Sequence, residues 1–230
     1  MIVVALVGAI VWVLTNPESY DEIFTKVENT GAEGELRNIN IEGERTALTV
    51  LEELDVKGRA PKTGYSREMF YDGWPEIDGC SLRQRILKRE MGDSAVLDGC
   101  YVVAGEFDEP YTGEHRTLTE RSQFADIQID HVVALSDAWQ KGAQNISQEA
   151  RYALATDPLN LLAVDGGANK QKSDGDAATW LPKNKAFRCQ YVARQVAVKY
   201  KYKLWVTQAE KDAIVRVLGN CPSEPILSGK

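Results

Sequence analysis

Histidine is scarce in this chain of 230 residues, which contains only His115 and His131. No Cys-x-x-Cys pair is present, which argues against a zinc knuckle or a thioredoxin-like redox site. Internal repeats and low-complexity segments are also absent, which excludes a repeat architecture. Positive charge is in deficit, with 27 Lys and Arg against 34 Asp and Glu and a net charge of −7. That balance argues mildly against a nucleic-acid partner, because duplex binding needs cations opposite the phosphates.

The charge that is present is unevenly distributed. Residues 169–203 hold nine Lys and Arg and two Asp, a balance of +7, so the remainder carries −14. Such an asymmetry is what a basic face on an acidic protein would give. The alternative is an ordinary solvated helix face.

Four cysteines are present, at positions 80, 100, 189 and 221. An even count in an exported chain predicts two disulfides, for which three connectivities are possible. We favour Cys80–Cys100 and Cys189–Cys221, because each pair brackets one compact segment. The alternative is four buried free thiols, which an intracellular location would favour.

The N-terminal segment Ile2–Leu14 is almost wholly apolar. It is shorter than the roughly 20 residues that span a bilayer, and it lacks a basic flank and a cleavage site. We interpret it as the remnant of a signal anchor, with a buried strand or helix as the alternative. The expected organisation is an anchor remnant at 1–15, an acidic linker with a short helix at 16–57, a globular domain at 58–222 and a tail at 223–230.

Helical spacing and capping patterns recur through the domain. Ser81 and Thr207 each begin a capping-box pattern, and Ser147 is a further N-cap candidate. The expected helices cover 82–91, 135–142, 148–155, 183–202 and a segment that begins after Thr207 and ends at Gly219. A strand is expected at 100–105.

Three further segments predict a strand, a second strand and a short helix in that order. Residues 128–135 contain Asp130-His131 among β-branched residues, which is typical of a strand. Residues 157–162 form another short apolar run after an Asp-Pro turn. Residues 168–174 follow a Gly-Gly pair, with Asp165 as the expected helix N-cap.

This order resembles that of the HNH nucleases, whose ββα-metal core carries Asp-His on the first strand, a central Asn and a final His or Asn on the helix. From about Gly58 to Pro222 the chain resembles the exported actinobacterial HNH endonuclease family, related to the C-terminal domain of GmrSD restriction enzymes. The segments that carry the resemblance are Gly64-Tyr65-Ser66-Arg67, Gly79-Cys80, Pro110-Tyr111-Thr112-Gly113, Asp130-His131-Val132-Val133, Asp157-Pro158-Leu159-Asn160-Leu161, Asn169-Lys170-Gln171-Lys172 and Trp180-Leu181-Pro182.

The resemblance implies an α+β fold with a ββα-metal core and additional flanking helices. It also implies one Mg²⁺ or Mn²⁺ ion, whose oxygen ligands would be Asp130 and Asn169. The other implied roles are those of His131 as general base, Asn160 as the residue that orients the imidazole, and Lys170 and Lys172 near the scissile phosphate. Arg83 is a further candidate for phosphate binding, with a structural salt bridge as the alternative.

The chemistry of these residue types agrees with that assignment. A histidine with a pKa near 6.5 acts as a base at neutral pH, and His115 is the poorer candidate because it lies in a polar turn. Adjacent residues of a regular strand point to opposite faces, so Asp130 and His131 can both face a metal only if the strand begins or bulges there. A regular strand through both residues would count against Asp130 as a ligand.

We therefore expect an exported, metal-dependent endonuclease that cuts DNA with little sequence preference, with RNA left open as a substrate. Anchoring to the membrane through the N-terminal segment is expected, and no obligate protein partner is inferred. The alternatives are a catalytically weak nucleic-acid-binding surface module and a structural domain of the cell envelope.

Overall fold

The computed structural model describes residues 40–228, so the expected anchor remnant at 1–15 and most of the acidic linker lie outside the described residues. Within the described part, no helix has both the length and the apolar character needed to cross a bilayer. The α+β fold class is confirmed, and its strands and helices in chain order are β1 (Asn40–Thr46), α3 (Ala47–Leu51), β2 (Glu76–Ile77), β3 (Cys80–Ser81), α4 (Leu82–Met91), β4 (Val96–Asp98), β5 (Tyr101–Asp108), β6 (His115–Leu118), β7 (Ile127–His131), α5 (Leu135–Gln140), α6 (Gln148–Thr156), β8 (Leu161–Asp165), α7 (Gly166–Lys172), α8 (Arg188–Lys201), α9 (Gln208–Leu218) and β9 (Pro225–Ser228).

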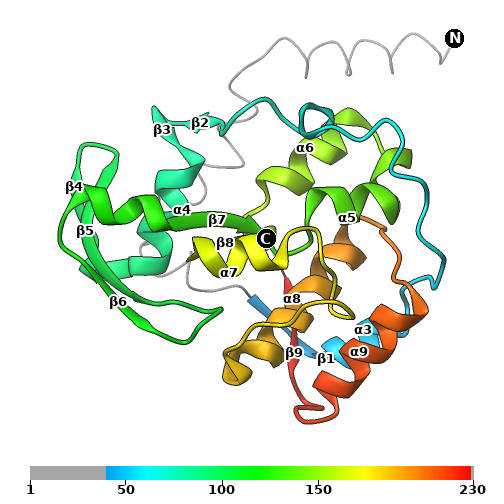
Figure 1. The fold of residues 1–230 in the computed structure, drawn as a ribbon. Helices are drawn as coiled ribbons and strands as arrows, with labels where there is room; N and C mark the ends of the chain where they lie inside the picture. The colour runs from blue at the N-terminus through cyan, green and yellow to red at the C-terminus, as the bar shows by residue number, and fades with distance from the viewer. Residues whose placement is uncertain (1–39, 229–230) are drawn as a thin grey trace, which may run out of the picture. The chain divides into compact units, whose positions relative to one another are not determined.

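The centre of the described body is an antiparallel pair of strands followed by a helix (Figure 1). Strand β7 pairs with β8 from Ile127 opposite Asp165 to His131 opposite Leu161. The chain between these strands forms α5 and α6. Helix α7 follows β8 directly and packs on both strands. The strand, strand and helix expected from the sequence are therefore present in the expected order.

One side of this centre is covered by the three-stranded sheet β4–β5–β6 and by α4 (Figure 1). Apolar side chains from α4, β5 and β6 pack against the inner face of the β7–β8 pair, among them Leu87, Phe107, Leu118 and Ile129. A disulfide joins Cys80 to Cys100 at the edge of this layer. This packing fixes β7 and therefore the place where the strand ends.

The other side is built around α8, whose middle turns are buried between α3, α9 and β9. Strand β1 pairs with β9 in antiparallel fashion, so chain segments near the two ends of the described range lie side by side. A second disulfide joins Cys189 to Cys221. Both favoured disulfide pairings are thus present in the structure.

Local capping signals agree with the structure at most of the expected helix starts. Ser147 and Thr207 each accept a hydrogen bond from the backbone N–H three residues later. Ser81 makes no such bond, although α4 begins immediately after it. The other half of the expected capping box is also missing, because the Gln84 side chain accepts from the Val102 backbone N–H at 2.9 Å in the neighbouring strand. The long helix expected from 183 also begins later, at Arg188, after a 3₁₀ turn.

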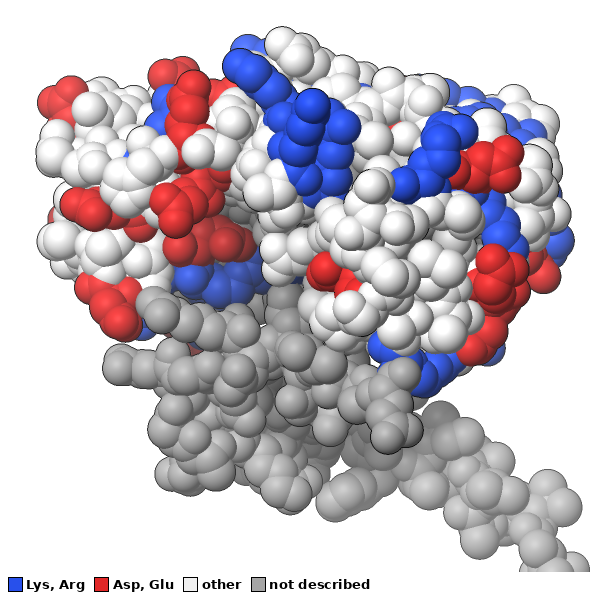
Figure 2. Space-filling view, turned by 90° about the horizontal axis from the view of Figure 1, so that it is seen from below, with Lys and Arg blue, Asp and Glu red and all other residues white. Residues whose placement is uncertain are grey.

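The basic stretch at 169–203 does not form a continuous basic face. Lys172, Arg194 and Lys199 are buried, and Lys201 is paired with Asp157. On the face shown in Figure 2, Lys and Arg gather in separate groups between acidic and uncharged residues. Four of the nine cations in this stretch are therefore buried or ion-paired, which reduces the exposed positive charge.

Candidate active site

A hollow of about 350 Å³ lies where β7 ends. Its wall includes Asp130 and His131 from β7 and Asn169 from α7. The structure thus brings together three of the residues that the sequence proposed for the site. Further polar groups on the wall are Lys62, Tyr65, Arg67, Ser136 and Asp174.

His131 is held in one orientation by the end of α6. Its Nε2 lies 2.9 Å from the carbonyl oxygen of Ala155, in the last turn of that helix. A carbonyl can only accept, so Nε2 carries the ring proton and Nδ1 keeps the lone pair. The ring also stacks on Trp74 with centroids 5.8 Å apart and an interplanar angle of 6°. Imidazole position and tautomer are therefore both fixed.

The electrostatic surroundings keep His131 neutral. Burial lowers its pKa to about 3, outweighing the opposite effect of the bond to Ala155, and the charges of Arg67 and Lys172 lower it further. At neutral pH the imidazole is therefore unprotonated. A neutral imidazole with a defined lone pair is the form that a general base requires.

Asn160 is fully buried and joins the two segments that hold His131. Its side-chain oxygen accepts from the Val133 N–H at 2.8 Å, and its amide nitrogen donates to the Leu154 carbonyl at 3.2 Å. The expected bond from Asn160 to the imidazole is absent, because that bond comes from the Ala155 carbonyl. Asn160 therefore affects the imidazole only indirectly. Its bonds hold the backbone after His131 and the last turn of α6, which carries the Ala155 carbonyl.

Asp130 lies on the other side of β7 in a nearly closed environment. Tyr111 donates its hydroxyl proton to one carboxylate oxygen, and the Lys172 ammonium lies 3.0 Å from the other. Burial raises the pKa of Asp130, although Lys172 and Tyr111 act in the opposite direction. The same Lys172 ammonium donates to the His131 carbonyl at 2.8 Å, so it fixes the end of β7.

The difficulty expected for adjacent Asp and His residues is visible in the structure. The pairing of β7 with β8 is regular through Asp130 and His131, and their side chains contact opposite surroundings. Both residues nevertheless reach the hollow, because β7 ends at His131. The regular pairing counts against Asp130 as a metal ligand, and only its place on the wall of the hollow keeps that role as a prediction.

Asn169 offers an oxygen to the hollow. Its amide nitrogen donates to the Gln128 side-chain oxygen at 2.8 Å, which leaves the carbonyl oxygen as the group free to bind a cation. Oxygen donors from Asp130 and Asn169 suit a hard divalent ion that keeps several waters. Elsewhere in residues 40–228, one group of three potential ligands (Cys189, Cys221 and Glu224) lies close together, but its cysteines form a disulfide.

The polar wall residues that were not predicted for the site are Lys62, Tyr65, Arg67, Ser136, Ser173 and Asp174. The Arg67 guanidinium lies over the Tyr71 ring at 5.1 Å and donates to its hydroxyl. Burial raises the pKa of Asp174, but hydrogen bonds from Ser136 and Lys62 outweigh it and lower that pKa. The signal that pointed to this region was the segment Gly64–Arg67, which carried the family resemblance without an assigned role.

Three residues predicted to bind substrate do not line the hollow. Arg83 donates to the backbone carbonyls of Ile127 at 2.8 Å and Phe124 at 3.1 Å, beneath the start of β7. Lys172 is buried against Asp130, whereas Lys170 is exposed on α7. Of the three, Lys170 has its side chain in solvent.

Fold and site together define an α+β protein with a strand–strand–helix centre that joins a neutral histidine to oxygen donors. The chain belongs to the family of the GmrSD restriction endonuclease C-terminal domain, whose model matches residues 83–217. It is also 36% identical over 186 residues to an "Uncharacterized secreted protein" of Arthroderma benhamiae, covering 79% of this chain and 88% of that relative. No solved structure matches. The expected family is confirmed, while its expected actinobacterial origin finds no support.

Proposed function

We propose that this protein is an HNH-type endonuclease that hydrolyses phosphodiester bonds of DNA, with a divalent metal ion and with little sequence preference. The observation that carries the proposal is the arrangement of His131, which is neutral, oriented through Nε2 and located on the same wall as Asp130 and Asn169. Membership of a restriction-endonuclease family supports the same class of reaction.

In the proposed reaction, His131 Nδ1 removes a proton from a water molecule in the hollow. The water oxygen attacks phosphorus while the bond to the 3′-oxygen breaks. The products then carry a 5′-phosphate and a 3′-hydroxyl. Asn160 and the Ala155 carbonyl keep the ring in place during this proton transfer, so Asn160 is a positioning residue.

Asp130 and Asn169 would hold one Mg²⁺ or Mn²⁺ ion. When bound, such an ion neutralises charge on the phosphate and on the leaving oxygen. Competition from the Lys172 ammonium for Asp130 implies that metal binding moves or loosens this ion pair.

Contacts to the phosphate are proposed for cations that the hollow or α7 presents. Arg67 and Lys62 lie on the wall beside His131, and Lys170 is exposed on the neighbouring helix. Lys172 and Arg83 support the reaction differently, because their bonds to Asp130 and to backbone carbonyls fix β7.

We also propose that the protein acts outside the cell. Support comes from two disulfides, which persist in oxidising compartments, and from a relative that is described as secreted. Anchoring through residues 1–15 remains a prediction, because these residues lie outside the described range.

The decisive experiment measures nicking of supercoiled plasmid by the full chain, produced under oxidising conditions, in Mg²⁺, in Mn²⁺ and in EDTA. Loss of a general base lowers a reaction rate by about 10²–10⁴-fold, so the His131→Ala variant should nick plasmid more slowly than the wild type by that factor. His115→Ala is the matched control, because His115 is exposed, pairs with Asp108 and does not line the hollow. Equal nicking by both variants would exclude His131 as the base.

A second candidate function is a nucleic-acid-binding module with little catalysis. The observation in its favour is that both oxygens of Asp130 already accept bonds from Tyr111 and Lys172. This alternative predicts salt-dependent binding of DNA that survives His131→Ala, together with intact plasmid in every metal condition.

A further inference from the structure

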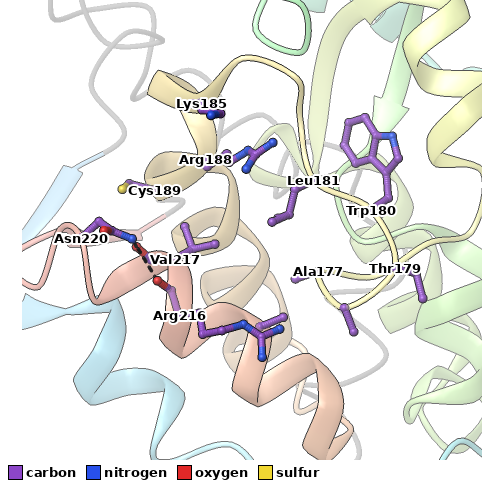
Figure 3. A pocket seen from close by; sticks show the side chains of 12 residues that line it. Ala177, Thr179, Trp180, Leu181, Lys185, Arg188, Cys189, Arg216, Val217 and Asn220 are labelled. Carbon is purple, nitrogen blue, oxygen red and sulfur yellow. Dashed lines mark hydrogen bonds between the residues drawn. The ribbon is translucent and has the colours of Figure 1, made fainter.

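A second and larger hollow, of about 720 Å³, lies away from His131. It is enclosed by the first turns of α8, the end of α9 and the loop that joins α7 to α8 (Figure 3). In Figure 3, Arg188, Leu181 and Val217 point into the space between these three elements. None of the residues expected for catalysis lies on its wall.

The wall of this second hollow is cationic. It includes Lys185, Arg188 and Arg216 and contains no Asp or Glu. Across residues 40–228, no ion pair joins any of these three to an acidic side chain. Arg188 Nε donates to the Pro182 carbonyl at 2.8 Å, which fixes the guanidinium and leaves its outer amino groups for another acceptor. Three cations without acidic partners among the described residues thus gather at one hollow, where they are available to an external anion.

The remaining wall is mostly apolar, with Thr179 and Asn220 as its polar members, and a disulfide holds part of it in place. Ala177, Leu181 and Val217 supply apolar surface, and Cys189 on the wall is bonded to Cys221 beyond the end of α9. That disulfide ties the two helices together at the hollow. The cations are therefore presented on a preformed surface, which lowers the entropic cost of binding.

The two hollows share one loop. Asp174 lines the hollow beside His131, and Ala177 lines the second hollow. Three residues of chain span at most about 11 Å. Each strand of duplex DNA advances about 3.4 Å per nucleotide, so a few nucleotides cover this separation. The length of a short strand is therefore compatible with contact to both hollows.

We propose that the second hollow is an anchor for the phosphodiester backbone of the nucleic-acid strand, away from the bond that is cut. Two of the three cations are arginines, whose planar forks match phosphate oxygens, and the apolar surface suits the sugars and bases between phosphates. The proposal rests on the proposed function, because it assumes that nucleic acid is the substrate.

The test measures binding of a labelled single strand of about 16 nucleotides to the full chain in EDTA, by fluorescence anisotropy over a range of salt concentrations. The variant is Lys185→Gln/Arg216→Gln, since neither side chain forms a hydrogen bond or ion pair with another residue of the described range. The slope of log K against log salt is negative, and losing two phosphate contacts should make it shallower by about 1.4. The control is Lys88→Gln/Arg121→Gln, which removes the same charges from exposed positions elsewhere and should leave the slope unchanged.

The outcomes separate this proposal from the proposed function. An unchanged slope in the Lys185/Arg216 variant, with plasmid nicking intact, overturns the anchor and leaves the nuclease proposal standing. An equal decrease in both double variants also overturns it, because the effect is then one of total charge. Equally strong displacement by polyglutamate would assign the hollow to acidic protein segments. A wild-type protein that neither binds nor nicks DNA would refute both proposals.

Discussion

Two groups of buried charges in this protein use the same residue types in different ways. In the first, which we call the closed cluster, Asp137, Asp176 and Glu210 surround Lys141 at 2.6–2.7 Å. Lys199 and Arg59 complete the closed cluster with further ion pairs. In the second, at the hollow beside His131, Asp130 has a single cationic partner, Lys172.

The number of partners decides the protonation state. In the closed cluster, burial alone would raise the pKa of Asp176, but Lys141 and Arg59 lower it to about 2. Burial would likewise lower the pKa of Lys141, and the surrounding carboxylates raise it instead. Asp176 and Lys141 therefore stay charged although they are buried.

At the hollow beside His131, the effect of burial on the pKa values outweighs that of the neighbouring charges. It raises the pKa of Asp130 and of Tyr111 and lowers that of His131 to about 3. Each of these groups is pushed toward its neutral form because charge partners are too few. The comparison indicates that the closed cluster is arranged for stability, whereas the hollow keeps a neutral imidazole beside a carboxyl group with a single cationic partner, an arrangement common at functional sites.

The largest effect is expected from breaking the closed cluster. Lys141→Met removes the central cation and leaves buried carboxylates facing one another, which costs about 3–5 kcal/mol of unfolding free energy. Urea unfolding at neutral pH measures this loss. Lys57→Met is the control, because its pair with Asp55 is exposed and should change stability by less than about 1 kcal/mol. Equal stabilities of the two variants would show that the closed cluster is not a stabilising unit.

A smaller effect is expected from the corresponding change at the hollow. Lys172→Met leaves the buried Asp130 carboxylate without its cationic partner and should lower the free energy of unfolding by about 1–3 kcal/mol at neutral pH. Removing the ammonium raises the pKa of Asp130 further, so the buried acid can take a proton and become neutral. The cost should therefore shrink as the pH is lowered toward 5 in urea unfolding. A cost that stays constant with pH would mean that Asp130 remains charged without Lys172.

Local signals explain which parts of this comparison were predictable from sequence. The N-caps Asp165, Ser147 and Thr207 act on backbone groups three residues away, so the helices that follow them could be predicted from the sequence. The order of strand, strand and helix could be predicted as well, because short β-rich runs and turns mark those elements. Asn160, expected at the start of the second strand, lies instead in the 3₁₀ turn Pro158–Asn160 just before β8.

The contacts that define the site could not be predicted in the same way. His131 is oriented by the carbonyl of Ala155, and a backbone group leaves no signal in the side-chain pattern. Lys141 meets Glu210 across 69 residues, so its burial depends on tertiary packing. A sequence rich in lysine therefore suggests an exposed basic face even where some of the lysines, such as Lys172 and Lys199, are buried in internal ion pairs.

The finest distinction between the two charge groups concerns the pH dependence of stability. Unfolded chains bind a proton at histidine below a pH of about 6.5, whereas folded His131 does so only near pH 3. Between these values the unfolded state binds the extra proton, so stability falls as the pH falls, by about 1.4 kcal/mol per pH unit. His131→Gln should remove this slope between pH 6 and 4, measured as the difference from wild type in urea unfolding.

His115→Gln should not remove it, because His115 is exposed and its pKa is raised by Asp108. An unchanged slope in His131→Gln would mean that the imidazole is accessible to protons in the folded protein, which would place the base in contact with solvent and in a state that titrates near neutral pH.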